Sequence, residues 1–420
     1  MTGGTNLAHV AIWFITLAAL AGVIVRPWRV PEAAWAGAGA VALVVFSLLP
    51  WQQALAGVAK GRDVYLFLAG MMLLSEMARN ERLFDWLAAR AARFAQGSAT
   101  RLFALVYGVG VVVTVFLSND ATAVVMTPAV HAAARAANAV ALPYLFACAF
   151  VANAASFVLP ISNPANFVVF GSDLPPLGAW LARFALPSLA AIVATYVALR
   201  VVLRRALQAP LARDVPLPAL TRGGRVAAAG ITVAGVALVL ASAYGFDLGM
   251  ATFTVAIVTL AVVLTVERAS PWPIVRQVSW GILPLVAGLF VLVEGLRASG
   301  AIDLLRQALT QLAAHSTHGA AFVVGIVVAL ACNVLNNLPA AFIAGSTAAG
   351  AHVDPRIGDA ILIGIDLGPN LSVTGSLATL LWLAALRHDG VAMRGRDFLR
   401  VGACVMPPAL LLALAAAVWH

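Results

Sequence analysis

Two carboxylates lie in stretches of this sequence that are otherwise almost free of charge. Asp120 follows Ser118 and Asn119 in the apolar segment 101–135, and Asp366 opens an irregular stretch in the second half of the chain. In a bilayer a carboxylate costs about 3 kcal/mol or more, so such groups usually mark proton or ion pathways. We therefore predict that both acids bind and release protons or help to hold Na⁺. The alternative is that each caps the N-terminus of a half-helix by accepting backbone N–H bonds.

Uncharged hydrogen-bonding side chains accompany these acids at four places in the sequence. The candidate solute-binding residues among them are Ser118, Asn119, Thr122, Asn163, Asn166, Asn336, Asn337, Asn370, Ser372, Thr374 and Ser376. Hydroxyl and amide groups can both donate and accept hydrogen bonds, and no Lys or Arg lies at any of the four places. The set predicts a site for a neutral, polyhydroxylated solute or a weakly held cation, and disfavours a dianion. For each residue the alternative is that it satisfies the backbone at an irregular turn.

The composition places these residues in a membrane protein. Of 420 residues, 62% are hydrophobic and 10% are charged, whereas soluble domains carry about 25% charged residues. Several nearly uncharged stretches, including 8–25, 33–49 and 226–243, are long enough to cross a hydrocarbon layer of roughly 30 Å. The net charge of +9 comes from arginines between such stretches, a distribution typical of cytoplasmic loops and not of nucleic-acid binding. The three cysteines are far apart and indicate neither a disulfide framework nor a metal site.

Apolar runs and helix-breaking residues predict an all-α polytopic membrane protein with about ten transmembrane helices. We expect these helices at 8–25, 33–50, 63–78, 143–170, 178–203, 226–243, 248–266, 280–297, 357–386 and 398–418. Two of them, 143–170 and 357–386, contain Pro and Gly at a density that breaks a helix. Two further apolar segments, 101–135 and 319–350, carry polar residues at the centre and are predicted to be re-entrant hairpins.

An internal repeat divides the chain into two halves. At an offset of 218 residues (336 minus 118), Glu76 falls on Glu294 and Ser118-Asn119 falls on Asn336-Asn337. Inverted repeats are a recurring plan of secondary transporters, and broken helices at matching positions of two halves point to the solute site. We therefore predict that both hairpin tips and both breaks converge near the middle of the bilayer. The predicted boundaries are 1–205 for the first half, 206–225 for a cytoplasmic linker and 226–420 for the second half.

The distribution of basic residues predicts the orientation of the chain. Most of the 26 Lys and Arg residues lie in segments that face the cytoplasm when both termini are placed outside. We therefore expect a protein of the bacterial inner membrane with both termini outside. Glu76 and Glu294 then lie near the membrane surfaces, where an anchoring role is favoured over a role in transport. Cys332 lies one helical turn before Asn336, and we favour a small buried hydrophobe over a ligand.

The sequence contains no motif for enzymatic chemistry. The P-loop, His-Glu-x-x-His and Gly-x-Ser-x-Gly patterns are all absent. We therefore expect a secondary transporter and not an enzyme, without a cofactor or bound metal, driven by an ion gradient or by a separate subunit.

Three motifs resemble those of one transporter family. They are Phe116-Leu117-Ser118-Asn119-Asp120-Ala121-Thr122-Ala123, Asn336-Asn337-Leu338-Pro339, and Asp366-Leu367-Gly368-Pro369-Asn370 leading into Gly375-Ser376-Leu377-Ala378-Thr379-Leu380-Leu381-Trp382. Together these motifs look like those of the ArsB arsenite efflux permeases of the ion transporter superfamily, and the resemblance covers nearly the whole chain. The resemblance implies export of arsenite, and usually antimonite, by exchange with protons or with a soluble ATPase partner. Arsenite is mostly the neutral trihydroxide near neutral pH, which agrees with a site free of cationic side chains.

The sequence leaves two other functions open. One is a Na⁺/H⁺ antiporter of the same superfamily, which also has an Asn-Asp pair in its hairpin. The other is a membrane scaffold that holds a soluble ATPase through its arginine-rich inner surface. Related carriers of di- and tricarboxylates place two Ser-Asn-Thr tips around Na⁺. The tips here read Ser118-Asn119-Asp120 and Asn336-Asn337-Leu338, which argues against transport of carboxylates.

We expect a monomer in the lipid bilayer.

Overall fold

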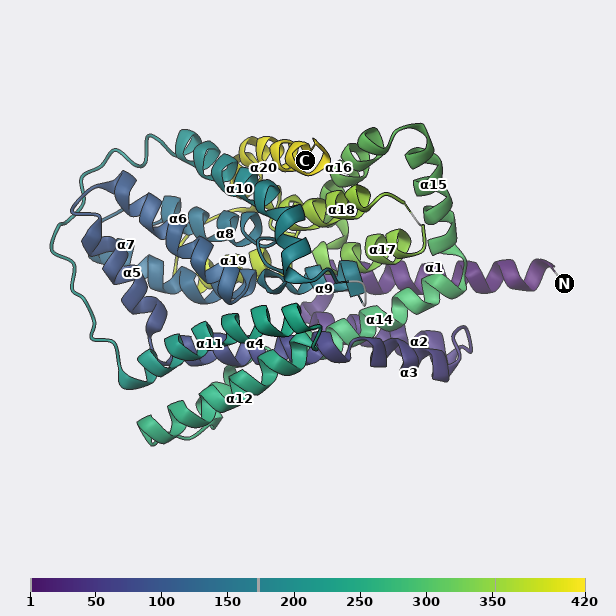
Figure 1. Cartoon of the computed structure of the whole chain (residues 1–420), viewed down its shortest axis with the longest axis horizontal. Coiled ribbons are helices and arrows are strands. Elements are labelled where there is room, and N and C mark those ends of the chain that lie inside the picture. Colours follow the sequence, from purple (N-terminus) through teal and green to yellow (C-terminus); the bar gives the residue numbers. More distant parts are fainter. Residues whose placement is uncertain (1, 172–173, 352, 420) are drawn as a thin grey trace.

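The part of the chain that the structure describes is built from helices and contains no strand. The computed structural model describes residues 2–171, 174–351 and 353–419, and most of its helices lie along the long axis of the molecule (Figure 1). Helix α1 (Thr2–Val25) begins at one end of this axis, and the linker that leads into α11 (Arg222–Tyr244) lies at the other. The predicted all-α class is confirmed.

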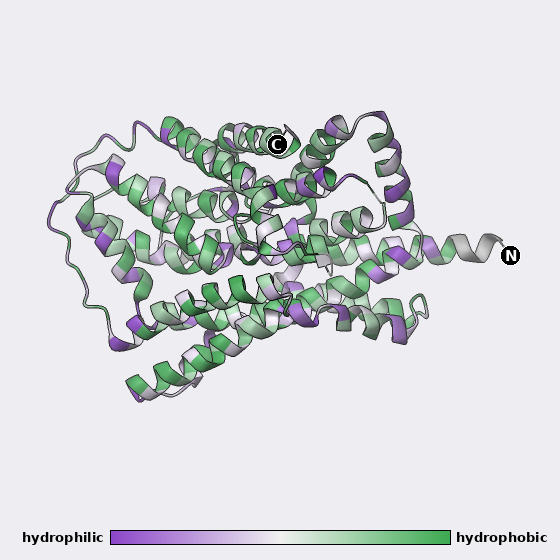
Figure 2. Ribbon diagram, viewed as in Figure 1, coloured by the Kyte–Doolittle hydropathy of each residue, from purple (hydrophilic) through white to green (hydrophobic). Residues whose placement is uncertain are grey.

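Seven helices of the described ranges are long and apolar enough to cross a membrane. They are α1, α6 (Ala99–Phe116), α10 (Leu177–Val202), α11, α12 (Leu248–Glu267), α16 (Thr317–Leu335) and α20 (Gly395–Trp419). An eighth candidate is α14 (Ile282–Ala298) together with α15 (Ala301–His315), which are bent by 74° at their junction. Hydrophobic residues cover most of their length (Figure 2). The protein is therefore a multi-pass membrane protein, as its composition predicts.

Helix length does not establish the predicted number of ten spans. The segment predicted at 33–50 is the 14-residue helix α2 (Glu32–Val45), followed by a turn and α3 (Trp51–Lys60). The turn forms because Ser47 has a φ of 55° and Pro50 cannot donate a helical hydrogen bond. The segment at 63–78 is α4 (Arg62–Asn80), which carries charged residues near both ends. The number of spans stays a prediction.

Each half contains a helical hairpin whose first arm begins at a serine cap. In the first, α6 is followed by a tip, by wide π-helical turns at Ala121–Met126 and by α7 (Thr127–Ala136); in the second, α16 is followed by α17 (Asn337–Ala349). The Ser98 hydroxyl accepts from the N–H of Arg101 (3.3 Å), and the hydroxyl of Ser316, 218 residues later, accepts from the N–H of Gly319 (3.1 Å). Serine N-caps of this kind satisfy the free N–H groups of a first turn.

Each half also contains two short helices with an irregular break between them. The first pair is α8 (Leu142–Ala154) and α9 (Pro164–Phe170), and the second pair is α18 (Pro355–Leu367) and α19 (Leu377–His388). Pro160 and Pro164 interrupt the first helix, and Gly368 and Pro369 interrupt the second, because proline cannot extend the hydrogen-bond ladder. α8 is buried from Pro143 to Ala154, so the broken helices lie in the core of the protein.

The second half repeats the helix order of the first. Elements α1 to α10 recur in order as α11 to α20, including the remaining pairs α5 (Leu83–Phe94) with α15 and α3 with α13 (Trp272–Gln277). Contacts between the halves are reciprocal: α2 packs on α14 and α12 on α4, while α9 packs on α17 and α19 on α7. Such exchange of partners is what a two-fold relation between halves produces. The membrane orientation of the halves stays a prediction.

Candidate functional site

The two broken helices cross in the interior and join the halves by hydrogen bonds between side chains. The Asn163 amide donates to Oδ1 of Asp366 (2.5 Å), and the Asn153 amide donates to Oδ1 of Asn370 (2.9 Å). Asn370 in turn donates to the Phe150 carbonyl (3.1 Å). We define the helix crossing as a cluster of six polar side chains, Asn153, Ser156, Asn163, Asn166, Asp366 and Asn370.

Asp366 is the only ionisable member of the helix crossing. It is fully buried, and its second carboxylate oxygen, Oδ2, has no hydrogen-bond partner among the residues that the structure describes. Ser156 lies beside it and donates to the Asn153 carbonyl (2.7 Å). Asp366 occupies the last turn of α18, where the negative end of the helix dipole opposes an anion. Capping of a helix N-terminus, the alternative considered for Asp366, is therefore wrong.

Asp120 also does not cap a helix. At the first hairpin tip the Ser118 hydroxyl accepts from the N–H of Ala121 (3.2 Å), and Asn119 accepts from the N–H of Asp120 (2.9 Å). The Asp120 carboxylate makes no hydrogen bond to any residue that the structure describes, and it lines a narrow cavity. Ser118 and Asn119 therefore satisfy backbone N–H groups of the tip, and the Asp120 carboxylate has no partner among the described residues.

The second hairpin tip packs on the second break. The N–H of Asn337 donates to the Gly375 carbonyl (2.9 Å), and the Asn336 amide donates to the Thr374 carbonyl (3.4 Å). Asn333, one turn before the tip, accepts from the Ser372 hydroxyl (2.7 Å). Its carbonyl accepts from the Thr374 hydroxyl (2.9 Å), and Ser376 caps α19. Hairpin and break therefore form one hydrogen-bonded unit.

Two predicted solute-binding residues make their contacts mainly with the protein itself. The Thr122 hydroxyl is fully buried and lies 2.8 Å from the hydroxyl of Thr114 on the other arm of its hairpin. The Asn166 amide donates to three carbonyls of the first break, at 2.9 to 3.3 Å. Only Oδ1 of Asn166 is buried without a partner. Both residues hold irregular backbone in place.

Three residues of this region were not predicted from the sequence. They are Asn153 and Ser156 at the helix crossing, and Asn333 beside the second tip. A signal for them was present, because an amide in an apolar helix is costly to bury unless it is hydrogen-bonded. Asn153 and Asn333 both lie in such helices.

Two cavities occupy equivalent places in the two halves. The wide cavity, of about 740 Å³, is lined by Phe290, Glu294 and Phe342 among others. The narrow cavity, of about 60 Å³, is lined by the residues 218 positions earlier, Met72, Glu76 and Val124, and by Asp120. Glu294 pairs with Lys60 and Arg297, while Glu76 pairs with Arg79 (2.8 Å). The described structure thus has a wide cavity beside the second hairpin and only a narrow one beside the first.

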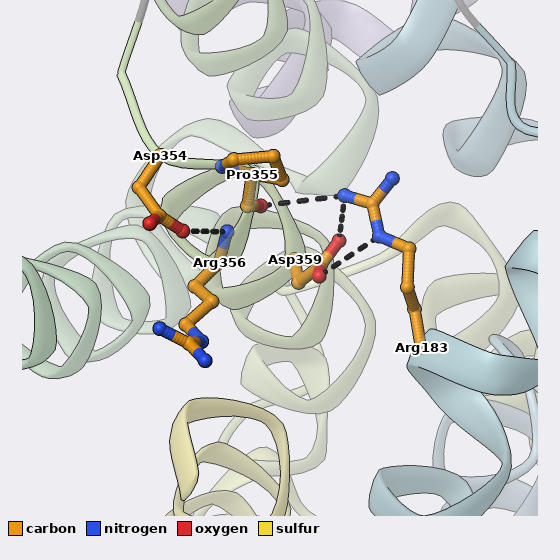
Figure 3. Close-up of polar contacts among 5 residues, drawn as sticks. All are labelled: Arg183, Asp354, Pro355, Arg356 and Asp359. Carbon is orange, nitrogen blue, oxygen red and sulfur yellow. Dashed lines mark hydrogen bonds and ion pairs between the residues drawn. The ribbon is translucent and has the colours of Figure 1, made fainter. Parts of the chain in front are cut away.

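An ion pair holds the outer ends of α9 and α18. Arg183, in α10, donates through Nε to Asp359 Oδ2 (2.9 Å), through Nη2 to its other oxygen, and to the Pro355 carbonyl (3.3 Å) (Figure 3). Its guanidinium also lies 5.5 Å from the ring of Phe170, the last residue of α9. Asp359 lies seven residues before Asp366, so the pair anchors the helix that carries the buried acid.

Removal of Arg183 should destabilise the protein by about 3 kcal/mol, because Asp359 would be left buried without its cation. Arg183→Gln is expected to lower the midpoint of thermal unfolding in detergent, and Asp359→Asn in the same chain should restore much of the loss. Arg356→Gln is the matched control, since the Arg356 side chain extends away from Asp359 (Figure 3). Equal losses for Arg183→Gln and Arg356→Gln would contradict the anchoring role.

Similarity to known proteins agrees with this architecture. The family model described as citrate transporter (CitMHS) matches residues 12–363. The chain is 30% identical over 363 residues to the arsenical pump membrane protein of Yersinia enterocolitica, and 29% identical over 370 residues to that of Escherichia coli, covering 82% of this chain and 83% of each relative. The crystal structure of the Alcanivorax borkumensis YdaH transporter shares the fold, with a TM-score of 0.59 at 13% identity over 88% of this chain and 87% of that chain. The protein therefore belongs to the citrate transporter (CitMHS) family and is a membrane transporter, related to the arsenical pump membrane proteins as the motifs of its hairpins and second break indicate.

Proposed function

We propose that this transporter exports arsenite, and antimonite as a second substrate, from the cytoplasm in exchange for protons. The observation that carries the proposal is the helix crossing, where a buried carboxylate has amides and a hydroxyl around it and no cationic partner among the described residues. The names of the relatives, arsenical pump membrane proteins, support the choice of substrate.

The chemistry of the crossing favours a neutral solute over citrate, which the family description names. None of the hydrogen bonds that the described residues make at the crossing involves Arg or Lys. A tricarboxylate would require cationic partners, since burying unpaired charge is costly. Arsenous acid carries three hydroxyl groups and no charge near neutral pH, so amide and hydroxyl side chains satisfy it.

Asp366 is proposed to carry a proton in the described state. A deprotonated carboxylate would need donors for both oxygens, and only Oδ1 has one. A protonated carboxyl group instead offers an O–H donor at Oδ2, and the hydroxyl oxygen of Ser156, which lies beside Asp366, can accept it. Release of this proton when the site is exposed to the other side of the membrane would couple solute movement to the gradient.

The wide and narrow cavities support transport by alternating exposure. Each cavity lies next to one hairpin, and they are equivalents in the two halves. Exchange of the two arrangements between the halves would close the wide cavity and open the narrow one, where Asp120 lies.

We place the chain in the bacterial inner membrane as a monomer with both termini outside, so that the wide cavity faces outward. The first half is assigned to 1–205 and the second to 226–420, with the linker 206–225 in the cytoplasm.

Everted membrane vesicles test the proposal. Vesicles that contain the protein should accumulate arsenite when their interior is acidified, and Asp120→Asn should abolish this accumulation because the hairpin tip then has no titratable group. The matched control Asp85→Asn, which removes a carboxylate that forms an exposed ion pair with Arg82 outside the tip, should retain most of it. Dissipation of the pH gradient by Na⁺ and not by arsenite would assign the chain to Na⁺/H⁺ antiport. Transport by the purified chain in liposomes would show that no soluble ATPase is required.

A further inference from the structure

A groove with a basic rim lies at the C-terminal end of α10, outside the proposed transport site. It has a volume of about 490 Å³ and is lined by Thr100, Tyr196, Val197, Arg200, Val201, Arg204, Leu207 and Gln208. These residues come from the end of α10, from the turns that follow it, and from the first turn of α6. The groove thus combines two cations and three polar groups with an apolar wall.

The two arginines of the groove have no acidic partner in the described ranges. Neither guanidinium makes a hydrogen bond or ion pair there, and both side chains are exposed. Other arginines of the molecule, such as Arg183 and Arg306, are paired with carboxylates. Arg200 lies in the last turn of α10 and Arg204 in the turn that follows it, and both side chains line this groove. Two unpaired cations on one side of a groove favour an anion.

An apolar ridge leads from the lipid-facing side of α10 to these arginines. Leu189, Val193, Val197 and Val201 follow one another at four-residue spacing and are 57%, 50%, 51% and 58% exposed. α10 is long and apolar enough to cross a membrane, so the ridge faces hydrocarbon and the arginines lie where the helix reaches the head groups. A ligand that fits the whole feature has an anionic head and a hydrocarbon tail.

We propose that this groove binds an anionic phospholipid. The phosphate diester is held by the guanidinium groups of Arg200 and Arg204, Thr100 and Gln208 contact the polar head, and an acyl chain lies along the ridge from Val201 to Leu189. Basic pockets at helix ends on the cytoplasmic side are suited to such head groups. The proposal is independent of the transported solute, because the groove shares no residue with the helix crossing or with either cavity.

Native mass spectrometry of the intact protein in detergent tests the site with phosphatidylglycerol and phosphatidylcholine as probes. We expect phosphatidylglycerol to bind more tightly, with a dissociation constant that rises about fivefold in Arg200→Gln or Arg204→Gln and about 30-fold in the double variant, at roughly 1 kcal/mol per cation. The matched control is the double variant Arg135→Gln and Arg396→Gln, which removes two arginines that are also exposed and unpaired in the described part. It should leave the dissociation constant within twofold of the unaltered protein.

Three outcomes would overturn the proposal. One is equal affinity for the two lipids, and another is an equal loss in the control variant, which would indicate general attraction to a basic surface. The third is displacement of phosphatidylglycerol by millimolar inorganic phosphate, which would assign the groove to a free anion. Thermal unfolding of each variant is measured alongside, and a loss of lipid selectivity with an unchanged unfolding midpoint is the result that supports the site.

Discussion

Asp366→Asn is expected to abolish proton-driven export while leaving the fold intact. Asparagine has the shape of aspartic acid and, like its protonated form, offers an oxygen acceptor on one side and a donor group, here NH2, on the other. The acceptor replaces the Oδ1 that binds Asn163, and the donor replaces the Oδ2 that has no partner. The variant therefore resembles the proton-loaded state permanently. It cannot release a proton, so solute movement is no longer tied to the pH gradient.

Vesicles measure this loss quantitatively. With one proton exchanged per arsenite, a gradient of one pH unit supports about tenfold accumulation at equilibrium, since one unit corresponds to about 1.4 kcal/mol. Asp366→Asn should reduce the accumulation ratio to one and still allow exchange of labelled for unlabelled arsenite. Its midpoint of thermal unfolding at neutral pH should equal or exceed that of the unaltered protein. Accumulation that persists in this variant would remove Asp366 from the coupling mechanism.

Gly364→Ala should disrupt the second broken helix and abolish export. A Cβ at Gly364 would lie 2.4 Å from the carbonyl oxygen of Gly325 in α16, a backbone atom that cannot move independently. α18 and α16 would have to separate, and overpacking of this kind costs about 1–3 kcal/mol or more. Asp366 lies two residues further along the same helix, so the shift would also displace it from Asn163.

A second glycine of the same helix provides the control. A Cβ at Gly358 would meet no atom within 4 Å, and replacement of glycine by alanine inside a helix stabilises it by about 0.5–1 kcal/mol. Gly358→Ala should therefore raise the unfolding midpoint slightly and preserve export, whereas Gly364→Ala should lower the midpoint and lose export. If the two variants have the same unfolding midpoint and the same export activity, the close approach of α16 and α18 is not required for the geometry of the site.

The local features of this protein were predictable because they depend on residues close together in the chain. The hydropathy identified most of the helices, and Pro160, Pro164 and Pro369 marked the breaks because proline interrupts a helix wherever it occurs. A helix was predicted at 33–50, but its end at Val45 was missed because Ser47 adopts a left-handed conformation that hydropathy does not report. Short helices such as α3 and α13 were also missed, since they carry little apolar signal of their own.

The partners of each polar side chain were decided by tertiary structure. The sequence by itself determined a membrane protein of two similar halves with polar residues at its hairpin tips and breaks. Hydropathy, helix-breaking residues and an internal repeat are properties of the residue order alone, so they can be recognised without a structure. It did not determine that Asn163 would meet Asp366, 203 residues away, or that Asn166 would bind the backbone while Asp120 found no partner in the described part of the chain. Those outcomes depend on the angle and depth at which α8, α9 and α18 cross, and packing between helices distant in sequence sets both.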